Sequence, residues 1–167
     1  MHIPTLEDVF RAQRVIAPYL RPTPLLRSAS LSALLECEAY LKCENVQPIG
    51  VFKIRGGINL LSSLSEEERR RGVITPSTGN HGQSIAYAAR LFGAPAVIAA
   101  PENCNPYKRR AMERLGARVT LIGKDFDESR LWAEQEAVRQ NYRYVHVANE
   151  PLLIAGVGTM SLEIMSD

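Results

Sequence analysis

The hydrophobic pattern of the chain begins with a helical period. Apolar residues recur every three or four positions after Thr5, a residue type that caps helices, and the Pro-rich segment 21–24 ends the pattern. The apolar residues on this face are Leu6, Val9, Phe10 and Ile16. Ser28 or Ser30 can then open a short helix, and residues 39–44 (AYLKCE) are predicted to form a strand.

From residue 52 onward, predicted helices and strands alternate. The helices are expected at residues 52–64, 80–92, 106–116 and 127–141, with a last helix that starts near Gly158. Asn105 is the expected cap of the third of these helices, and Pro106 is its first residue. The strands are expected at residues 73–75, 94–100, 117–123 and 142–148. These strands are nearly continuous apolar runs with short connections, which is typical of a parallel sheet. We therefore predict an α/β fold with a parallel sheet flanked by helices.

Composition favours one globular domain and excludes several classes. The 167 residues are 46% hydrophobic and 23% charged, and the net charge of +2 is too small to indicate a nucleic-acid partner. The charged segment 66–72 (EEERRRG) has the pattern of a solvated helix end. No apolar run is long enough for a membrane span, and the acidic, amphipathic N-terminus is unlike a signal peptide. Three cysteines without a C-x-x-C pair favour a reduced, cytoplasmic protein, and the dispersed histidines predict no metal site.

The segment PSTGNHGQS (residues 76–84) carries more polar groups than a helix cap needs. Ser77, Thr78 and Asn80 are all capping residue types, and two glycines leave the backbone open to a ligand. In open α/β sheets, ligands bind beyond the carboxyl ends of the strands, where helix N-termini present free N–H groups. The segment therefore indicates an anion site for a carboxylate or a phosphate; the alternative is an ordinary helix cap.

The segment GVFKIRGG (residues 50–57) places Lys53 and Arg55 in the first turn of a predicted helix. The helix dipole disfavours cations at this end, and burial behind Val51 and Phe52 would disfavour the charged form of the lysine further. A neutral amine is the form that makes a Schiff base with a carbonyl. Because most lysines lie on the surface, an ordinary exposed lysine remains the alternative at this stage.

A third segment, GVGTMS (residues 156–161), has the start of the glycine pattern of a dinucleotide-binding turn. It lacks the third glycine of that pattern, so the case for a nicotinamide site is weak.

Together these segments resemble the threonine dehydratase and serine racemase group of pyridoxal-phosphate enzymes, which have fold type II (tryptophan synthase β-like). KCENVQPIGVFKIRGG resembles the segment that carries the cofactor lysine in that group, which usually ends in Ser-Phe-Lys-x-Arg-Gly. STGNHGQS resembles the asparagine loop of the group. PENCNPYKRRAMERLGARV and AGVGTMSLEI are similar to two further segments in the same order, so the resemblance extends from about Thr5 to the last residue.

The resemblance implies a role for the residues of both motifs. Lys53 would bind the cofactor as a Schiff base and then act as the base at the substrate α-carbon. Phe52 would pack beside the cofactor, and Asn80 would hydrogen-bond its 3′ oxygen. Thr78 would occupy the acid–base position of the loop. The loop that receives the substrate carboxylate would consist of Ser77, Thr78, Gly79, Asn80 and His81.

The chain also departs from the group pattern. Val51 replaces the usual serine before Phe-Lys, and Val157 stands where glutamine is common. Members of the group are longer, so the resemblance implies part of a large domain (1–52), a small α/β domain (53–150) and a return into the large domain (151–167). The phosphate-binding loop of the group, the partner of the pyridine nitrogen and any cation site would lie beyond these residues.

The implied function is pyridoxal-phosphate-dependent β-elimination from L-threonine or L-serine, which yields a 2-oxo acid and ammonia. The expected partner is a small-molecule amino acid, with neither nucleic acid nor membrane, and the full-length protein is expected to be a cytoplasmic homo-oligomer. Two alternatives stay open: a serine racemase-like enzyme, and a non-catalytic α/β module that binds an amino-acid carboxylate or a partner chain.

Overall fold

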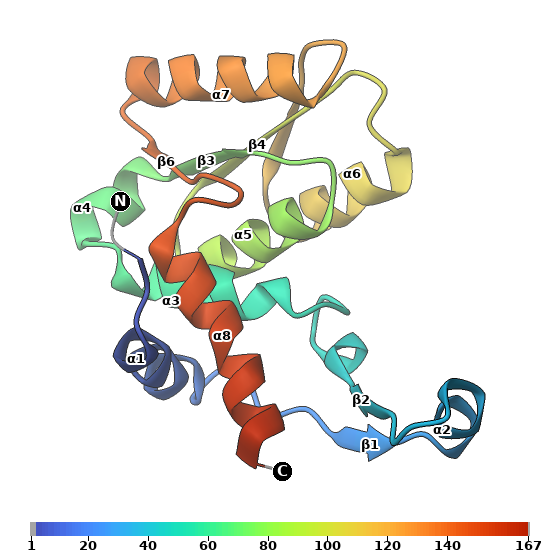
Figure 1. Cartoon of the computed structure of the whole chain (residues 1–167). Helices are drawn as coiled ribbons and strands as arrows, with labels where there is room; N and C mark the ends of the chain where they lie inside the picture. The colour runs from blue at the N-terminus through green and yellow to red at the C-terminus, as the bar shows by residue number, and fades with distance from the viewer. Residues whose placement is uncertain (1–2, 167) are drawn as a thin grey trace.

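The computed structural model describes residues 3–166 and contains a four-stranded parallel sheet in the order β5-β4-β3-β6 (Figure 1). The strands are β3 (Val73–Pro76), β4 (Ala96–Ala100), β5 (Arg118–Leu121) and β6 (Arg143–Tyr144). Every residue of β3 and β4 is buried, because helices cover both faces of the sheet. The predicted α/β class with a flanked parallel sheet is confirmed.

Helices form one layer on each face of this sheet. On one face lie α5 (Asn80–Leu91), α6 (Pro106–Arg114) and α3 (Lys53–Ser63), and on the other lies α7 (Phe126–Gln140) (Figure 1). Successive strand residues point to opposite faces. Val73 and Ile98 therefore join the apolar cluster beneath α3 and α5, whereas Ile74 and Val97 join a smaller cluster with Ala133 and Ala137 of α7.

Two further helices, α1 (Leu6–Ile16) and α8 (Pro151–Ser166), pack against α3 and against each other. The backbones of α3 and α8 come very close: a Cβ added to Gly56 would lie 2.8 Å from the Leu153 carbonyl oxygen, and one added to Gly156 would lie 2.7 Å from that of Arg55. The prediction that the last helix starts near Gly158 was wrong. Glycines that suggested a turn instead allow close helix packing, and the helix begins at Pro151, where proline is well tolerated.

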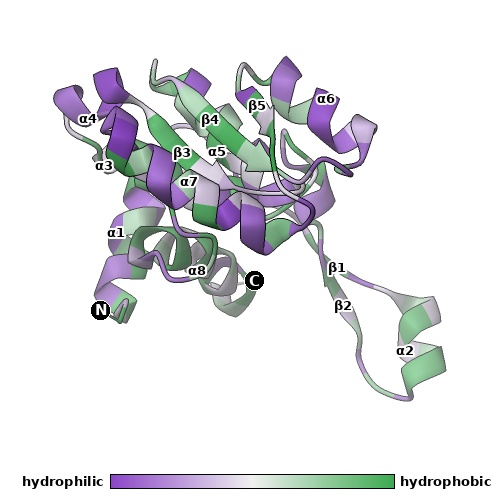
Figure 2. Cartoon of the chain, turned by 90° about the horizontal axis from the view of Figure 1, so that it is seen from above, coloured by the Kyte–Doolittle hydropathy of each residue, from purple (hydrophilic) through white to green (hydrophobic). Residues whose placement is uncertain are grey.

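Residues 25–43 form an arm that extends away from the rest of the molecule (Figures 1 and 2). The arm contains the antiparallel strands β1 (Leu25–Arg27) and β2 (Tyr40–Lys42), joined through α2 (Ala29–Leu35). No residue of α2 is buried. A short 3-10 helix, η1 (Glu44–Val46), leads back to α3. Ser28 caps α2 as predicted, whereas β1 was not predicted.

Two element predictions need correction. Of the predicted strand 142–148, only Arg143–Tyr144 pair with β3, because Nδ1 of His146 accepts the N–H groups of Ala148 (3.0 Å) and Asn149 (2.9 Å) and turns the chain. Segment 66–72 is a separate helix, α4 (Glu66–Arg71), with its own capping box, rather than the end of a longer one. Within residues 3–166, no helix is both long and apolar enough to cross a membrane.

Candidate active site

Lys53 is the first residue of α3, as predicted, and no side chain caps this helix. Its Nζ lies 5.6 Å from the centroid of the Phe52 ring. The Ser84 hydroxyl of α5 donates a 2.5 Å hydrogen bond to the Lys53 carbonyl, and a Cβ on Gly57 would lie only 2.4 Å from the Ser84 oxygen. Close packing of α3 on α5 therefore fixes Lys53 relative to the start of α5.

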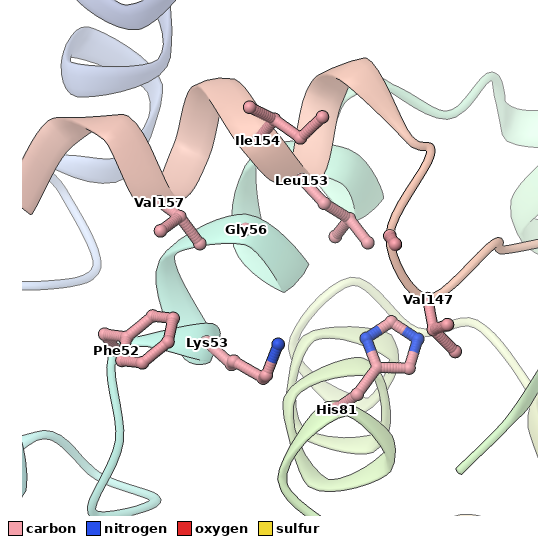
Figure 3. A pocket seen from close by; sticks show the side chains of 9 residues that line it. Phe52, Lys53, Gly56, His81, Val147, Leu153, Ile154 and Val157 are labelled. Carbon is pink, nitrogen blue, oxygen red and sulfur yellow. The ribbon is translucent and has the colours of Figure 1, made fainter.

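On one side, Lys53 lines a cavity of about 290 Å³ (Figure 3). Most of the cavity wall is apolar and comes from three places: Phe52 beside α3, Val147 after β6, and the first turns of α8. The α8 residues in this wall are Leu153, Ile154 and Val157. Val157, a departure from the group pattern, thus faces the same space as Lys53. The other α8 residues of this wall were not predicted from the sequence, although Leu153 and Val157 have the four-residue spacing of one helix face.

On its other side, Lys53 lines a second cavity of about 280 Å³ formed by the predicted anion loop. All five predicted loop residues line it: Ser77, Thr78, Gly79, Asn80 and His81. Lys108 of α6 joins them, and its side-chain Cδ would lie 3.3 Å from a Cβ on Gly79. No acidic residue of the described chain lines either cavity, whereas two lysines line this one. The charge balance favours an anion here.

Ser77 shapes the loop rather than offering its side chain to a ligand. Its buried hydroxyl oxygen accepts the N–H groups of Gly79 (3.1 Å) and Gly82 (2.8 Å). Gly82 is also a packing residue, because a Cβ there would lie 2.4 Å from the Met112 sulfur. The expectation that both glycines expose backbone to a ligand is therefore wrong for Gly82, whose N–H is already bonded.

The remaining loop donors are free to meet a ligand. Helix α5 begins after Gly79 without a side-chain cap. Within residues 3–166, the amide N–H groups of Thr78, Asn80 and His81 have no hydrogen-bond partner. The side chains of Thr78 and Asn80 are exposed. These groups lie at the positive end of the α5 dipole, which is a suitable place for a carboxylate.

His81 lines both cavities and is almost completely buried. Burial, together with the charges of Lys53 and His146, lowers the pKa of His81 to about 4. The imidazole is therefore neutral at pH 7. Its Nε2 lies 2.8 Å from the hydroxyl oxygen of Thr75, a buried residue of β3 that was not among the predicted site residues.

Arg55 occupies the opposite side of α3 and is buried in an ionic network. Its guanidinium binds both oxygens of Glu44 (2.7 and 2.8 Å) and both oxygens of Glu163 (2.6 and 2.9 Å). Lys42 Nζ also lies 2.9 Å from Glu163. The network ties the start of α3 to the arm and to α8. The sequence placed Arg55 in the unfavourable first helical turn but did not reveal these partners.

The structure excludes a dinucleotide-binding turn at residues 156–161, because this segment lies inside α8 rather than between a strand and a helix. Among residues 3–166, no group of three or more His, Cys, Asp or Glu side chains could hold a metal ion.

Several solved structures share this fold over almost the whole chain. Maize serine racemase matches with a TM-score of 0.93 and 32% identity, covering 99% of this chain and 50% of that one. The processed form of threonine deaminase isoform 2 from Solanum lycopersicum matches with a TM-score of 0.86 and 32% identity, covering 98% of this chain and 49% of that one.

Sequence relatives agree with the structural ones. The L-threonine ammonia-lyase of Thermotoga maritima is 45% identical over 163 residues, which cover 98% of this chain and 41% of the relative. The catabolic L-threonine dehydratase of Staphylococcus aureus is 40% identical over 167 residues, covering 99% of this chain and 48% of the relative. The chain thus spans less than half the length of these relatives. The family model described as pyridoxal-phosphate dependent enzyme matches residues 16–167, and the chain belongs to this family.

Proposed function

We propose that the full-length protein eliminates water from a hydroxy amino acid, L-threonine or L-serine, with pyridoxal phosphate as cofactor. Hydrolysis of the resulting enamine then returns one water and releases a 2-oxo acid and ammonia. The observation that carries the proposal is the position of Lys53, whose amine lies where an apolar cavity meets a loop of unpaired N–H donors. Relatives named threonine ammonia-lyase and threonine dehydratase support this class of substrate.

The residues around Lys53 fit pyridoxal phosphate. The apolar wall suits a flat aromatic ring, Phe52 lies at its edge, and Lys53 offers a primary amine for covalent attachment. We assign Asn80, exposed at the start of α5, to the ring oxygen beside the attachment point. When bound, the cofactor withdraws electrons from the substrate α-carbon and so stabilises the carbanion formed there.

The apolar wall offers little to a phosphate group. Lys53 is the single basic side chain, apart from the neutral His81, among the described residues that line the first cavity. A buried phosphate dianion needs paired donors, so we expect this 167-residue chain alone to bind the cofactor weakly. Stoichiometric binding that survives dialysis would show that the chain contains a phosphate site of its own.

We assign the substrate carboxylate to the loop at the start of α5. The unpaired N–H groups of Thr78, Asn80 and His81 would donate to it, and the Lys108 ammonium supplies a positive charge on the same cavity. His81 is neutral and adds no charge. A carboxylate held there would place the substrate α-carbon toward Lys53, which we assign as the base that removes the α-proton.

A racemase is the second candidate, because maize serine racemase shares the fold with a TM-score of 0.93. The two reactions begin with removal of the same proton. They differ in whether a second acid returns a proton to the opposite face of the α-carbon or the β-hydroxyl leaves. Thr78, whose exposed hydroxyl lies on the loop, is the residue that we assign to this choice.

The proposal is tested with the full-length protein, L-threonine, L-serine and L-alanine. We expect equal amounts of 2-oxo acid and ammonia from the two hydroxy amino acids and none from alanine, which has no β-leaving group. Removing pyridoxal phosphate by dialysis against hydroxylamine should abolish turnover, and adding it back should restore turnover. If D-serine is the main product, the racemase is the better reading; if neither product forms and no cofactor binds, the protein is a non-catalytic module.

We also propose that the full-length protein is a homo-oligomer of the cytoplasm. The arm exposes apolar side chains that a second copy could cover, including Leu34 (76% exposed) and Leu35 (59% exposed). All three cysteines are free, which suits a reducing compartment. Light scattering of the full-length protein tests the first point, and a monomer at micromolar concentration would contradict it.

A further inference from the structure

The hydrogen bond between Thr75 and His81 determines which ring nitrogen carries the proton. The Thr75 hydroxyl oxygen lies 2.8 Å from His81 Nε2 and 2.7 Å from the carbonyl oxygen of Val145. A carbonyl oxygen only accepts, and a hydroxyl has a single proton. That proton is committed to Val145, so the Thr75 oxygen must accept from an N–H on His81 Nε2.

The same contact leaves the other nitrogen of the ring as an acceptor. A neutral imidazole with its proton on Nε2 carries a lone pair on Nδ1. Figure 3 shows this second nitrogen on the side of the cavity where the Lys53 amine lies. Within residues 3–166, Nδ1 has no hydrogen-bond partner, although it is not sealed from the cavity.

The surroundings of His81 keep the ring neutral. The charged or titratable groups that face it are Lys53 from α3, His146 from the segment after β6, and Lys108 from α6, which lines the same cavity. The α8 wall is apolar. No carboxylate of the described residues lines these cavities to stabilise an imidazolium, so the tautomer, rather than the charge, is what the protein controls.

We propose that Thr75 is a positioning residue that holds His81 in the Nε2–H tautomer, so that Nδ1 presents a lone pair, rather than an N–H, to the side of the cavity where the Lys53 amine lies. The opposite tautomer would point an N–H donor at that amine and repel its cationic form. The inference rests on the proposed function only in treating Lys53 as the reacting group; the tautomer itself follows from the contacts of Thr75.

The tautomer can be measured without cofactor or activity. Long-range ¹H–¹⁵N correlation spectra of the ¹⁵N-labelled 167-residue chain at pH 7 distinguish protonated from unprotonated ring nitrogens, and His81→Gln assigns the signals among the three histidines. We expect a protonated Nε2 and an unprotonated Nδ1 for His81. Thr75→Ser should preserve this pattern. Thr75→Val removes the acceptor, and the signals should shift toward a mixture of tautomers.

A matched control is Thr120→Val on β5, whose hydroxyl makes no hydrogen bond within the described residues and whose replacement should leave the His81 signals unchanged. In the full-length protein, we expect kcat to fall about tenfold in Thr75→Val, the scale of one lost hydrogen bond, and less than about twofold in Thr75→Ser. A proton on Nδ1 in the unmodified chain would overturn the inference, and so would an unchanged pure tautomer in Thr75→Val. If the valine variant does not fold, the spectra of the unmodified chain and of Thr75→Ser still test the inference, because both must show the Nε2–H tautomer.

The two proposals can fail separately. If the spectra show Nε2–H but the full-length protein turns over neither threonine nor serine, the proposed function is wrong and the tautomer assignment stands. If turnover occurs while His81 carries its proton on Nδ1, the proposed function stands and the positioning role of Thr75 is wrong.

Discussion

Lys53 and Arg55 are cations two residues apart on the first turn of α3, yet they face different surroundings. Arg55 is 2% exposed and is bound by two carboxylates, Glu44 and Glu163. Lys53 faces two cavities whose described lining contains no carboxylate. Both residues lie at the helix end that disfavours positive charge. The protein offsets that cost for Arg55 with two paired acids, whereas the described residues around Lys53 supply no such partner.

The difference separates a structural cation from one available for chemistry. A lysine bound to a buried carboxylate would be held in its charged form and unable to attack a carbonyl. Arg55 also fixes the first turn of α3, which carries Lys53. Its two carboxylate partners lie outside this helix: Glu44 in η1 and Glu163 in α8. Arg55 therefore fixes the position of Lys53. Substitution of Arg55 should lower the stability of the fold, whereas substitution of Lys53 should lower the activity.

The largest effect is expected for Lys53→Ala in the full-length protein. Loss of the attaching amine and base should lower kcat by at least about 10⁴-fold, the scale seen when a nucleophile is removed. The free energy of unfolding should change by less than about 1 kcal/mol, since the amine has no ion pair within residues 3–166. Lys124→Ala, at an exposed site, is the control for the loss of kcat.

The attachment point can be mapped directly. Borohydride reduction of the unmodified protein, followed by peptide mapping, should place the pyridoxyl group on Lys53. A label on Lys108 or Lys42 would refute the assignment.

The next largest effect is expected for Arg55→Met, which leaves the buried Glu44 without its cation and Glu163 with Lys42 alone. Breaking a buried ion pair in this way costs about 3–5 kcal/mol in the free energy of unfolding. Urea denaturation measures this loss. The matched control is Arg109→Met, whose exposed pair with Glu113 should contribute less than about 1 kcal/mol. Equal losses in the two variants would show that the Arg55 network is not the stronger one.

The pH dependence of the same variant sharpens this test. Burial opposes ionisation of Glu44 and Glu163, but hydrogen bonds from Arg55 outweigh it and hold the pKa of both carboxyls below the usual value. Their stabilising contribution is therefore present above the unfolded pKa of about 4.3 and is lost as the pH falls through the lower folded value. The stability difference between the unmodified chain and Arg55→Met should shrink from pH 7 to pH 3. A constant difference would argue against an electrostatic origin.

A third effect is expected from the buried neutral His81. Its folded pKa of about 4 lies below its ordinary value of 6.5, so the unfolded chain binds more protons between these values. Stability should therefore fall as the pH drops from about 6.5 to 4, by on the order of 3 kcal/mol. His81→Gln removes this part of the acid sensitivity and should flatten the curve of unfolding free energy against pH in that window. Equal slopes in the two proteins would contradict the shifted pKa.

The fold could be predicted where local pattern and tertiary packing agree. The apolar runs of β3 and β4 and the caps at Thr5, Ser28 and Asn105 lie where the sequence placed them. The prediction failed at α8, where Gly156 and Gly158 suggested a turn. A side chain at either glycine would crowd a neighbour that is distant in sequence: Arg55 for Gly156 and Val9 for Gly158. The local sequence does not reveal such contacts.

The candidate site likewise contains residues that local sequence motifs predict and residues whose role depends on distant neighbours. Lys53 and the loop at residues 77–81 could be found because their chemistry is concentrated in short motifs and the structure brings both to shared cavities. Thr75 was missed because an isolated threonine at the end of a strand reads as an ordinary strand residue. Its importance depends on Val145, which is 70 residues away in sequence. The division of the chain into domains at residues 52 and 150 stays a prediction.

The smallest effect is expected for substitutions of Thr78, which should change the ratio of D-serine to 2-oxo acid among the products. Thr78 keeps a hydroxyl on the cavity that Lys53 also lines, but its β-branch restricts χ1, and its methyl group would fill space near a substrate bound as proposed. Proton transfer requires the donor within about 2.6–3.2 Å of its target, so a restricted rotamer can disable a competent hydroxyl. We expect the full-length protein to convert L-serine to 2-oxo acid with little D-serine, and Thr78→Ser to raise the D-serine fraction severalfold, since serine rotates more freely. Thr78→Ala, which has no hydroxyl, is the matched control and should form the least D-serine of the three. Chiral chromatography of each reaction measures the ratio. Abundant D-serine from the unmodified protein, or no difference between the serine and alanine variants, would show that Thr78 does not decide between elimination and racemisation.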